Sequence, residues 1–248
     1  MSRRLTSLAV PLAIALLAVG CSSSGGESSV VADRGPSGEG ASTNVIEIAT
    51  VDGEMLAATA STVNDAMVTV VLAHMRGADR STWDPIIGDL NDAGYATLAF
   101  DFRGYGDSTG ARDTNLDVDL AAAVGQARSD GAAKVVVVGA SMGGTAVLAT
   151  GADLGVDGAV AISAPGRFLG LDGFAGASAF RTPILLIDSE SDQPYVADLA
   201  KIAADTDTSL VTFTGSAHGT SIFRDHDAEI TSEILSYIDL VATASSGY

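Results

Sequence analysis

The sequence of 248 residues is poor in cysteine, aromatic residues and positive charge. Its single cysteine, Cys21, excludes an intramolecular disulfide, and no paired Cys/His spacing suggests zinc, so we expect no metal and no cofactor. Aromatic residues make up only 5% of the chain, so the core must consist mainly of Ala, Val, Leu and Ile. The net charge of −18 disfavours partners such as nucleic acid and anionic lipid headgroups.

Apolar residues, in contrast, are abundant. They make up 47% of the chain, which is enough for a true core and excludes a disordered protein. The length favours one folded domain preceded by an N-terminal appendage. No internal repeat is evident in the sequence.

Residues 1–20 predict a signal peptide. They begin with a short positively charged region, and residues 8–19 are almost wholly apolar. That run is shorter than the roughly 20 residues that a membrane-spanning helix needs. Residues 18–21 resemble the lipobox of bacterial lipoproteins, with Ala18 where Leu is usual. We therefore expect lipid attachment at Cys21, and an ordinary secretory cleavage site is the alternative.

The segment that follows predicts a flexible tether. Residues 21–44 are rich in Ser and Gly and show no apolar periodicity. An N-terminal lipid anchor with such a tether would hold the folded domain, residues 45–243, at the outer face of a bacterial membrane. Secretion without an anchor is the alternative.

The folded part alternates strand-like and helix-like segments. Residues 45–50 and 54–61 are expected to pair as a hairpin, and the later segments suggest a mostly parallel sheet. Further strands are predicted at 67–73, 95–100, 134–138, 158–163, 183–188 and 210–214, and helices at 82–93, 115–129, 143–154, 195–205 and 228–241. This order favours an α/β fold with helices on both faces of the sheet and antiparallel strands at one edge. Functional residues should then follow the carboxyl ends of the strands.

One such strand end carries a nucleophile motif. Residues 139–143 read Gly-Ala-Ser-Met-Gly and match G-x-S-x-G, between a predicted strand and a predicted helix. So sharp a turn should strain Ser141 and hold its hydroxyl in the open, and a Cβ on either glycine should collide with the neighbouring strand and helix. A dinucleotide-binding turn is disfavoured because G-x-G-x-x-G is absent.

With this motif in this place, the chain resembles the α/β-hydrolase superfamily over residues 45–241. Residues 101–108, Asp-Phe-Arg-Gly-Tyr-Gly-Asp-Ser, are similar to a D-x-R-G-x-G-x-S loop of many members. The resemblance implies an α/β-hydrolase fold and a triad in the chain order serine, acid, histidine. It also implies a serine hydrolase, most simply an esterase, that forms an acyl-enzyme on Ser141.

The later strand ends offer an acid and a base in that order. By the resemblance Asp192 is the triad acid, because in similar proteins this residue lies about four positions past its strand; Asp188 and Glu190 are rivals in the same loop. His218 directly follows the last predicted strand and is the expected base, whereas His226 falls within or near the last helix. The base would take the serine proton, and the acid would orient and stabilise the imidazolium.

An oxyanion hole would complete the site. One donor is expected to be the backbone N–H of Met142, which follows the nucleophile. Residues 74–77, His-Met-Arg-Gly, resemble the H-G-x-G loop of the family, with Met75 where Gly is usual. The resemblance implies that the Arg76 N–H is the second donor, and each donor can lower the barrier by about 3–4 kcal/mol. The alternative for His74 is a strand-end residue that braces this loop.

The segment 164–182 separates two strands where larger relatives insert a cap, and it can hold one short helix at most. We therefore expect an accessible cleft with minimal cap. Its apolar residues, Phe168, Leu169, Leu171 and Phe174, are expected either to line that cleft or to pack beneath the loop.

The same triad also serves peptidases, thioesterases and acyltransferases, so a small-molecule ester is only the leading substrate class. An inactive, membrane-tethered binding protein on a hydrolase fold is another alternative. A periplasmic ligand-binding protein would need two similar lobes, for which the domain is short.

Overall fold

The computed structural model describes residues 41–206 and 208–244. The predicted signal peptide, the predicted lipid-attachment site at Cys21 and nearly all of the expected tether lie outside these residues. One boundary requires correction, because β1 (Ser42–Ala49) begins inside the segment predicted as the tether, 21–44. Within the described part of the chain, no helix is long and apolar enough to span a membrane.

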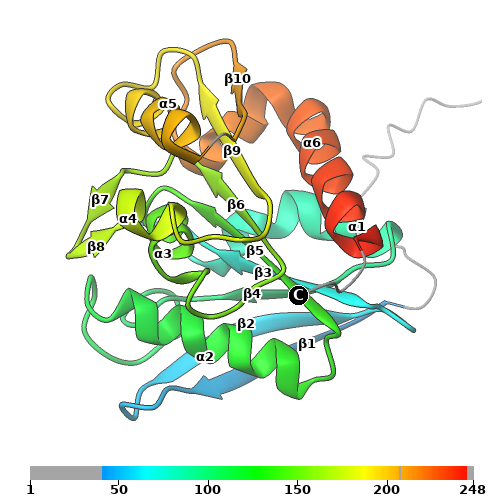
Figure 1. Cartoon of the computed structure of the whole chain (residues 1–248). Coiled ribbons are helices and arrows are strands. Elements are labelled where there is room, and N and C mark those ends of the chain that lie inside the picture. The colour runs from blue at the N-terminus through cyan, green and yellow to red at the C-terminus, as the bar shows by residue number, and fades with distance from the viewer. Residues whose placement is uncertain (1–40, 207, 245–248) are drawn as a thin grey trace, which may run out of the picture. The chain divides into compact units, whose positions relative to one another are not determined.

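The centre of the domain is an eight-stranded sheet with the order β1-β2-β4-β3-β5-β6-β9-β10 (Figure 1). β2 pairs antiparallel with β1 and with β4, and the remaining neighbours pair in parallel, as predicted. Its later strands are β2 (Met55–Thr62), β3 (Val68–Ala73), β4 (Ala96–Phe100), β5 (Lys134–Ala140), β6 (Gly158–Ile162), β9 (Ile184–Ser189) and β10 (Leu210–Phe213).

Helices cover both faces of this sheet (Figure 1). Alternate residues of each central strand face opposite sides, so Val135 and Val137 belong to one hydrophobic cluster and Val136 and Val138 to the other. The first cluster includes residues of α2, α3, α4 and α5, and the second includes residues of α1 and α6. These helices are α1 (Asp84–Asp92), α2 (Leu116–Ser129), α3 (Met142–Thr150), α4 (Gly173–Ala177), α5 (Tyr195–Thr206) and α6 (Phe223–Thr243).

Two helix starts differ from the sequence prediction. Instead of one helix over the predicted residues 82–93, a 3₁₀ turn (Arg80–Trp83) precedes α1, and its cap is Asp79, whose side chain accepts the Ser81 N–H at 2.9 Å. An aspartate cap satisfies an early amide that would otherwise lack a partner, which moves the start upstream. The sequence predicts that the last helix begins at 228, whereas α6 includes an earlier turn that is separated from the rest by non-helical backbone at His226.

The insertion between β6 and β9 is small, as expected. It contains β7 (Arg167–Phe168), β8 (Leu171–Asp172) and the five-residue α4. Of the four apolar residues singled out from the sequence, Phe168, Leu171 and Phe174 pack against the core, whereas Leu169 is 44% exposed. The interpretation that these residues pack beneath the loop therefore holds for three of them.

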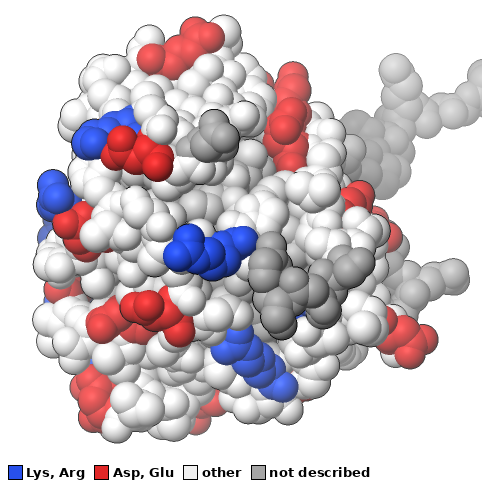
Figure 2. Space-filling model, viewed as in Figure 1, with Lys and Arg blue, Asp and Glu red and all other residues white. Residues whose placement is uncertain are grey.

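The charged residues do not gather into one large patch on the face drawn in Figure 2. Acidic and basic side chains lie there in small separate groups, with uncharged surface between them. The large negative net charge is therefore spread over this face, which shows no single acidic binding surface.

Candidate active site

The predicted nucleophile occupies a sharp turn between β5 and α3. Ser141 has φ 47° and ψ −111°, a strained conformation for a residue with a side chain. A Cβ on Gly139 would lie 2.4 Å from the Gly143 carbonyl oxygen, and a Cβ on Gly143 would lie 2.3 Å from the Ala73 carbonyl oxygen. Both flanking positions therefore require glycine, as the motif indicated, and the strain is held in place by the packing of α3 against β3.

The turn brings Ser141 into contact with the predicted base. The Oγ of Ser141 lies 2.7 Å from Nε2 of His218, and Nδ1 of His218 lies 2.7 Å from Oδ2 of Asp192. A carboxylate can only accept, so Nδ1 carries the proton and Nε2 is free to accept the serine proton. The side chain of His218 is 33% exposed and that of Asp192 is 8% exposed. A substrate can thus reach the serine and the histidine, while the carboxylate is shielded.

The rival residues do not contact the nucleophile–base pair. Asp188 is fully buried in β9 and Glu190 is exposed, and neither bonds to His218. Nε2 of His226 donates to the Thr214 carbonyl at 2.9 Å, away from the nucleophile. The geometry therefore brings together the residues that the sequence favoured.

The expected oxyanion loop, residues 74–77, is fixed by a buried histidine. Nε2 of His74 accepts the Phe102 N–H at 3.0 Å, so its Nδ1 carries the proton and donates to the Met75 carbonyl at 2.8 Å. Burial lowers the pKa of His74, which keeps this ring neutral. In a planar trans peptide the Arg76 N–H points opposite to the Met75 carbonyl, hence away from His74. The bracing role considered for His74 is therefore present in the structure.

The other expected donor lies at the start of a helix. Met142 is the first residue of α3, so its N–H has no intrahelical partner and is free for an external acceptor. Ser141 caps this helix without a side-chain hydrogen bond, so its hydroxyl does not compete for that amide.

Met75, which stands where the family usually has Gly, packs against the loop of the base. A Cβ on Gly219, the residue after His218, would lie 2.7 Å from Sδ of Met75, and the Thr220 hydroxyl lies 3.6 Å from the same sulfur. Met75 thus links residues 74–77 to the histidine loop, the segment from 214 to 220 that carries His218. It also borders a hollow of about 390 Å³ whose other lining residues include Thr82, Pro85, Phe223 and Arg224.

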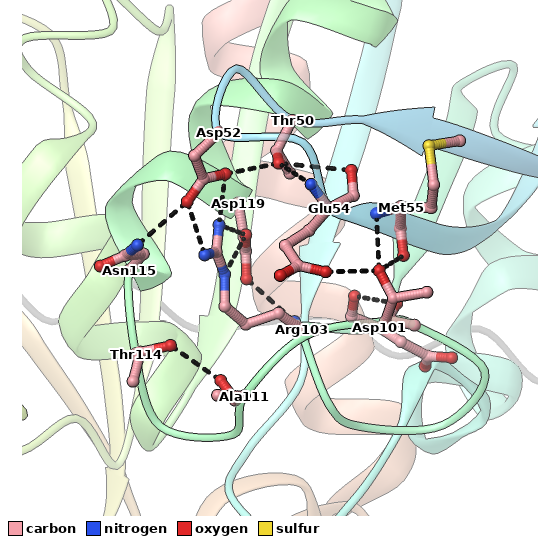
Figure 3. Close-up of polar contacts among 12 residues, drawn as sticks. Thr50, Asp52, Glu54, Met55, Asp101, Arg103, Ala111, Thr114, Asn115 and Asp119 are labelled. Atoms are coloured by element: carbon pink, nitrogen blue, oxygen red, sulfur yellow. Dashed lines mark hydrogen bonds and ion pairs between the residues drawn. The ribbon is translucent and has the colours of Figure 1, made fainter.

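The 101–108 loop is held by a network of polar contacts (Figure 3). Buried Arg103 binds Asp119 of α2, with Nε 2.9 Å from Oδ1, and Asp52 of the β1–β2 turn, with Nη1 2.7 Å from Oδ2. The hydrogen bond from Arg103 lowers the pKa of Asp52. The Asp101 carboxylate accepts the Arg80 N–H at 2.7 Å. Since Phe102 in the same loop donates to the oxyanion-loop histidine, this network holds that loop in place without contacting the nucleophile.

One neighbour of the base was not singled out from the sequence. The ring of Tyr195 lies 4.3 Å from that of His218, centroid to centroid, with an interplanar angle of 41°. Tyr195 lies three residues after Asp192, at the start of α5, and this closeness to the predicted acid could have indicated it. Helical periodicity alone did not relate Tyr195 to the loop of His218. Among the residues that the structure describes, no cluster of three His, Cys, Asp or Glu side chains could hold a metal ion.

Comparison with known proteins supports the fold. Residues 70–188, from β3 to β9, match the profile of the Alpha/beta hydrolase family, a span that includes Ser141 but not His218. No curated protein matches the sequence.

Solved structures of similar shape are numerous. An esterase of Pyrococcus furiosus is 20% identical, covers 80% of this chain and 90% of that one, and superposes with a TM-score of 0.71. An esterase domain from a Rhodothermus marinus protein is 22% identical over 79% of this chain and 97% of that one, with a TM-score of 0.68. A dienelactone hydrolase of Anabaena variabilis is 20% identical over 81% and 98%, with a TM-score of 0.67. The chain therefore has the α/β-hydrolase fold, as the sequence predicted.

Proposed function

We propose that the protein is a serine hydrolase that cleaves a carboxylic ester or a related acyl bond through an acyl-enzyme on Ser141. The observation that carries the proposal is the continuous chain of two 2.7 Å contacts from Ser141 through His218 to Asp192. A serine hydroxyl is a weak nucleophile until an adjacent base takes its proton, and this arrangement supplies that base in the required tautomer.

In the first half-reaction Oγ of Ser141 attacks the carbonyl carbon while its proton moves to Nε2 of His218. The N–H groups of Met142 and Arg76 stabilise the oxyanion, and the Asp192 carboxylate stabilises the imidazolium. The imidazolium then gives its proton to the departing alkoxide oxygen as the ester C–O bond breaks. In the second half-reaction His218 takes a proton from water, the resulting hydroxide attacks the acyl carbon, and the serine recovers its proton as the acid leaves.

An ester substrate is supported by the small insertion and by the relatives. The segment between β6 and β9 carries only two-residue strands and one five-residue helix, so the serine and histidine remain open to small substrates. Two of the similar structures carry the name esterase and one the name dienelactone hydrolase. Peptidases, thioesterases and acyltransferases use the same triad, and a substrate panel separates them from an esterase.

We also propose that the protein is exported and held at a membrane by a lipid on Cys21. The support is the sequence pattern of residues 1–21, a short charged segment and an apolar run that ends at the sole cysteine.

Labelling with a fluorophosphonate probe tests the catalytic proposal, combined with turnover of p-nitrophenyl esters of increasing acyl length. Wild-type protein should be labelled and should hydrolyse short esters, and Ser141→Ala should lose both properties. Ser216→Ala, which changes an exposed serine in the histidine loop, is the matched control and should retain both. Unlabelled, inactive wild-type protein would favour a binding protein on a hydrolase fold instead.

A further inference from the structure

A second carboxyl group lies buried beside the proposed triad acid. Asp188, at the carboxyl end of β9, has no exposed surface. Its Oδ1 accepts two hydrogen bonds, from the Ser163 hydroxyl at 2.7 Å and from the Ser189 N–H at 2.8 Å. Its Oδ2 is buried and has no partner among the described residues. A buried carboxylate oxygen without a donor is costly, so this atom requires an explanation.

The neighbouring residue Asp192 explains why Oδ2 of Asp188 has no donor. Burial raises the pKa of Asp188 to about 7, and the nearby Asp192 carboxylate contributes to the rise as a hydrogen-bond acceptor and as a negative charge. Asp192 is also buried and lies one turn further along the chain, where its N–H donates to the Ser189 carbonyl at 3.2 Å. Two neighbouring buried carboxyl groups do not both ionise, because their charges repel each other. Asp192 accepts from Nδ1 of His218, so it is the member of the pair that keeps the charge. The proton therefore belongs on Asp188.

We propose that Asp188 is a positioning residue of the active site, a neutral carboxylic acid that donates a hydrogen bond from Oδ2 to the Asp192 carboxylate. This inference rests on the proposed function, because its consequence is to hold Asp192 in line with His218. The two bonds to Oδ1 fix the carboxyl plane of Asp188, so that Oδ2 has one orientation. The triad carboxylate then receives two donors, one from the base and one from the sheet.

Few charged side chains surround the Asp188–Asp192 pair. Directly after β6 the facing residue is Ser163, and the register partner on β10 is Thr212, neither of which is charged. Glu190, two residues along the loop, is exposed. Beyond Asp192 lies His218. When Asp188 ionises, Asp192 loses a donor and gains a like charge, so the alignment of the acid with the imidazole weakens.

Two substitutions separate hydrogen bonding from charge. Asp188→Asn keeps an acceptor for Ser163 and places an NH₂ donor where the acid proton lies, whereas Asp188→Ala removes both. We expect Asp188→Asn to retain most of the wild-type kcat, and Asp188→Ala to lower kcat by about 10- to 100-fold with little change in KM, since small misalignments cost rates of that order. Glu190→Gln, which neutralises the exposed acid of the same loop, is the control and should leave kcat unchanged.

The pH profile provides a readout that a purely structural role would not change. Wild-type kcat/KM should show an additional decline as the pH rises through about 7, the value at which Asp188 ionises. Asp188→Asn should lack that decline, so the ratio of its activity to that of wild type should increase with pH. Superimposable profiles, or an Asn variant as impaired as the Ala variant, would overturn the inference.

Infrared spectroscopy tests the protonation state without using activity. The carbonyl stretch of a protonated buried acid should be visible at about pH 5.5, should disappear in Asp188→Asn and should persist in Glu190→Gln. A band that survives in Asp188→Asn refutes this inference alone. Wild-type protein that the fluorophosphonate does not label refutes the proposed function, and the infrared result then still shows whether Asp188 is the proton-bearing acid.

Discussion

Nε2 of His218 lies 2.7 Å from Oγ of Ser141 although 77 positions separate the two residues in the chain. The sheet accounts for this proximity, because β5, β6, β9 and β10 are successive parallel neighbours whose carboxyl ends share one edge. Ser141 follows β5, Asp192 follows β9 and His218 follows β10. Three loops thus deliver one side chain each to the same place.

Replacing the base should nearly abolish turnover. We expect His218→Ala to lower kcat/KM for a short p-nitrophenyl ester by roughly 10⁴- to 10⁶-fold, because no other group in the site can take the serine proton. The fold should persist, as judged by circular dichroism, since the side chain is partly exposed. His226→Ala removes a bond to the Thr214 carbonyl and a ring contact with Phe213, both away from the nucleophile, and should stay near the wild-type rate. The reverse pattern would show that His226 is the base.

Replacing the acid should be nearly as damaging. Asp192→Asn is expected to reduce kcat by about 10⁴-fold, because an amide can donate to Nδ1 and so stabilise the wrong imidazole tautomer. Glu190→Gln is the comparison, since that carboxyl is exposed in the same loop. A normal rate for Asp192→Asn would remove Asp192 from the triad.

The sharp turn at the nucleophile should not tolerate a methyl group. Gly143→Ala would place a Cβ 2.3 Å from the Ala73 carbonyl oxygen, so β3 or α3 must shift. We expect the free energy of unfolding to fall by at least about 1–3 kcal/mol in urea titrations, together with loss of labelling at Ser141. Gly125→Ala in α2 meets nothing within 4 Å and should instead stabilise the protein by up to about 1 kcal/mol. Equal stability of the two variants would contradict this packing.

Stability should depend on pH through Asp188. Its pKa is about 7 in the folded protein and 3.8 for an aspartate free of tertiary contacts, so the folded state holds this proton more tightly. Its stabilising contribution is complete below about pH 4 and is lost as the pH rises to about 7. Wild type therefore loses stability across that interval and Asp188→Asn does not, so the free energy of unfolding of the variant minus that of wild type should increase with pH. The upper limit of this increase is about 1.4 kcal/mol for each unit by which the folded and unfolded pKa values of Asp188 differ. Urea unfolding at several pH values measures this difference, and a constant difference would contradict it.

The N-terminal proposal predicts a chemical modification. Expressed with its full leader in a bacterium, the mature protein should begin at Cys21 and carry a mass increment from fatty acyl groups. Cys21→Ser should release the protein from the membrane fraction. Mass spectrometry of the mature N-terminus measures the modification, and an unmodified Cys21 thiol would refute it.

The fold and the main site residues could be predicted because their signals are local. A β-branched run, the G-x-S-x-G turn and an alanine-rich helix follow one another around Ser141, and the order of acid and histidine narrows the remaining choices. The Ser163–Asp188 contact and the tilted ring contact of Tyr195 with His218 depend on which strands and loops are neighbours in space. Their sequence segments carry no sign of that adjacency. The cap at Asp79 was not predicted because Asp79 and Ser81 are both residue types that cap helices, and the sequence does not show which of them accepts an early amide.

The short insertion between β6 and β9 leaves little chain to close over the acyl-enzyme. An acyl group on Ser141 would then meet bulk solvent directly, so its fate would depend on which nucleophiles are dissolved there. We expect added methanol to compete with water in proportion to its concentration, giving methyl ester in place of free acid, with no lag from a domain that must first open.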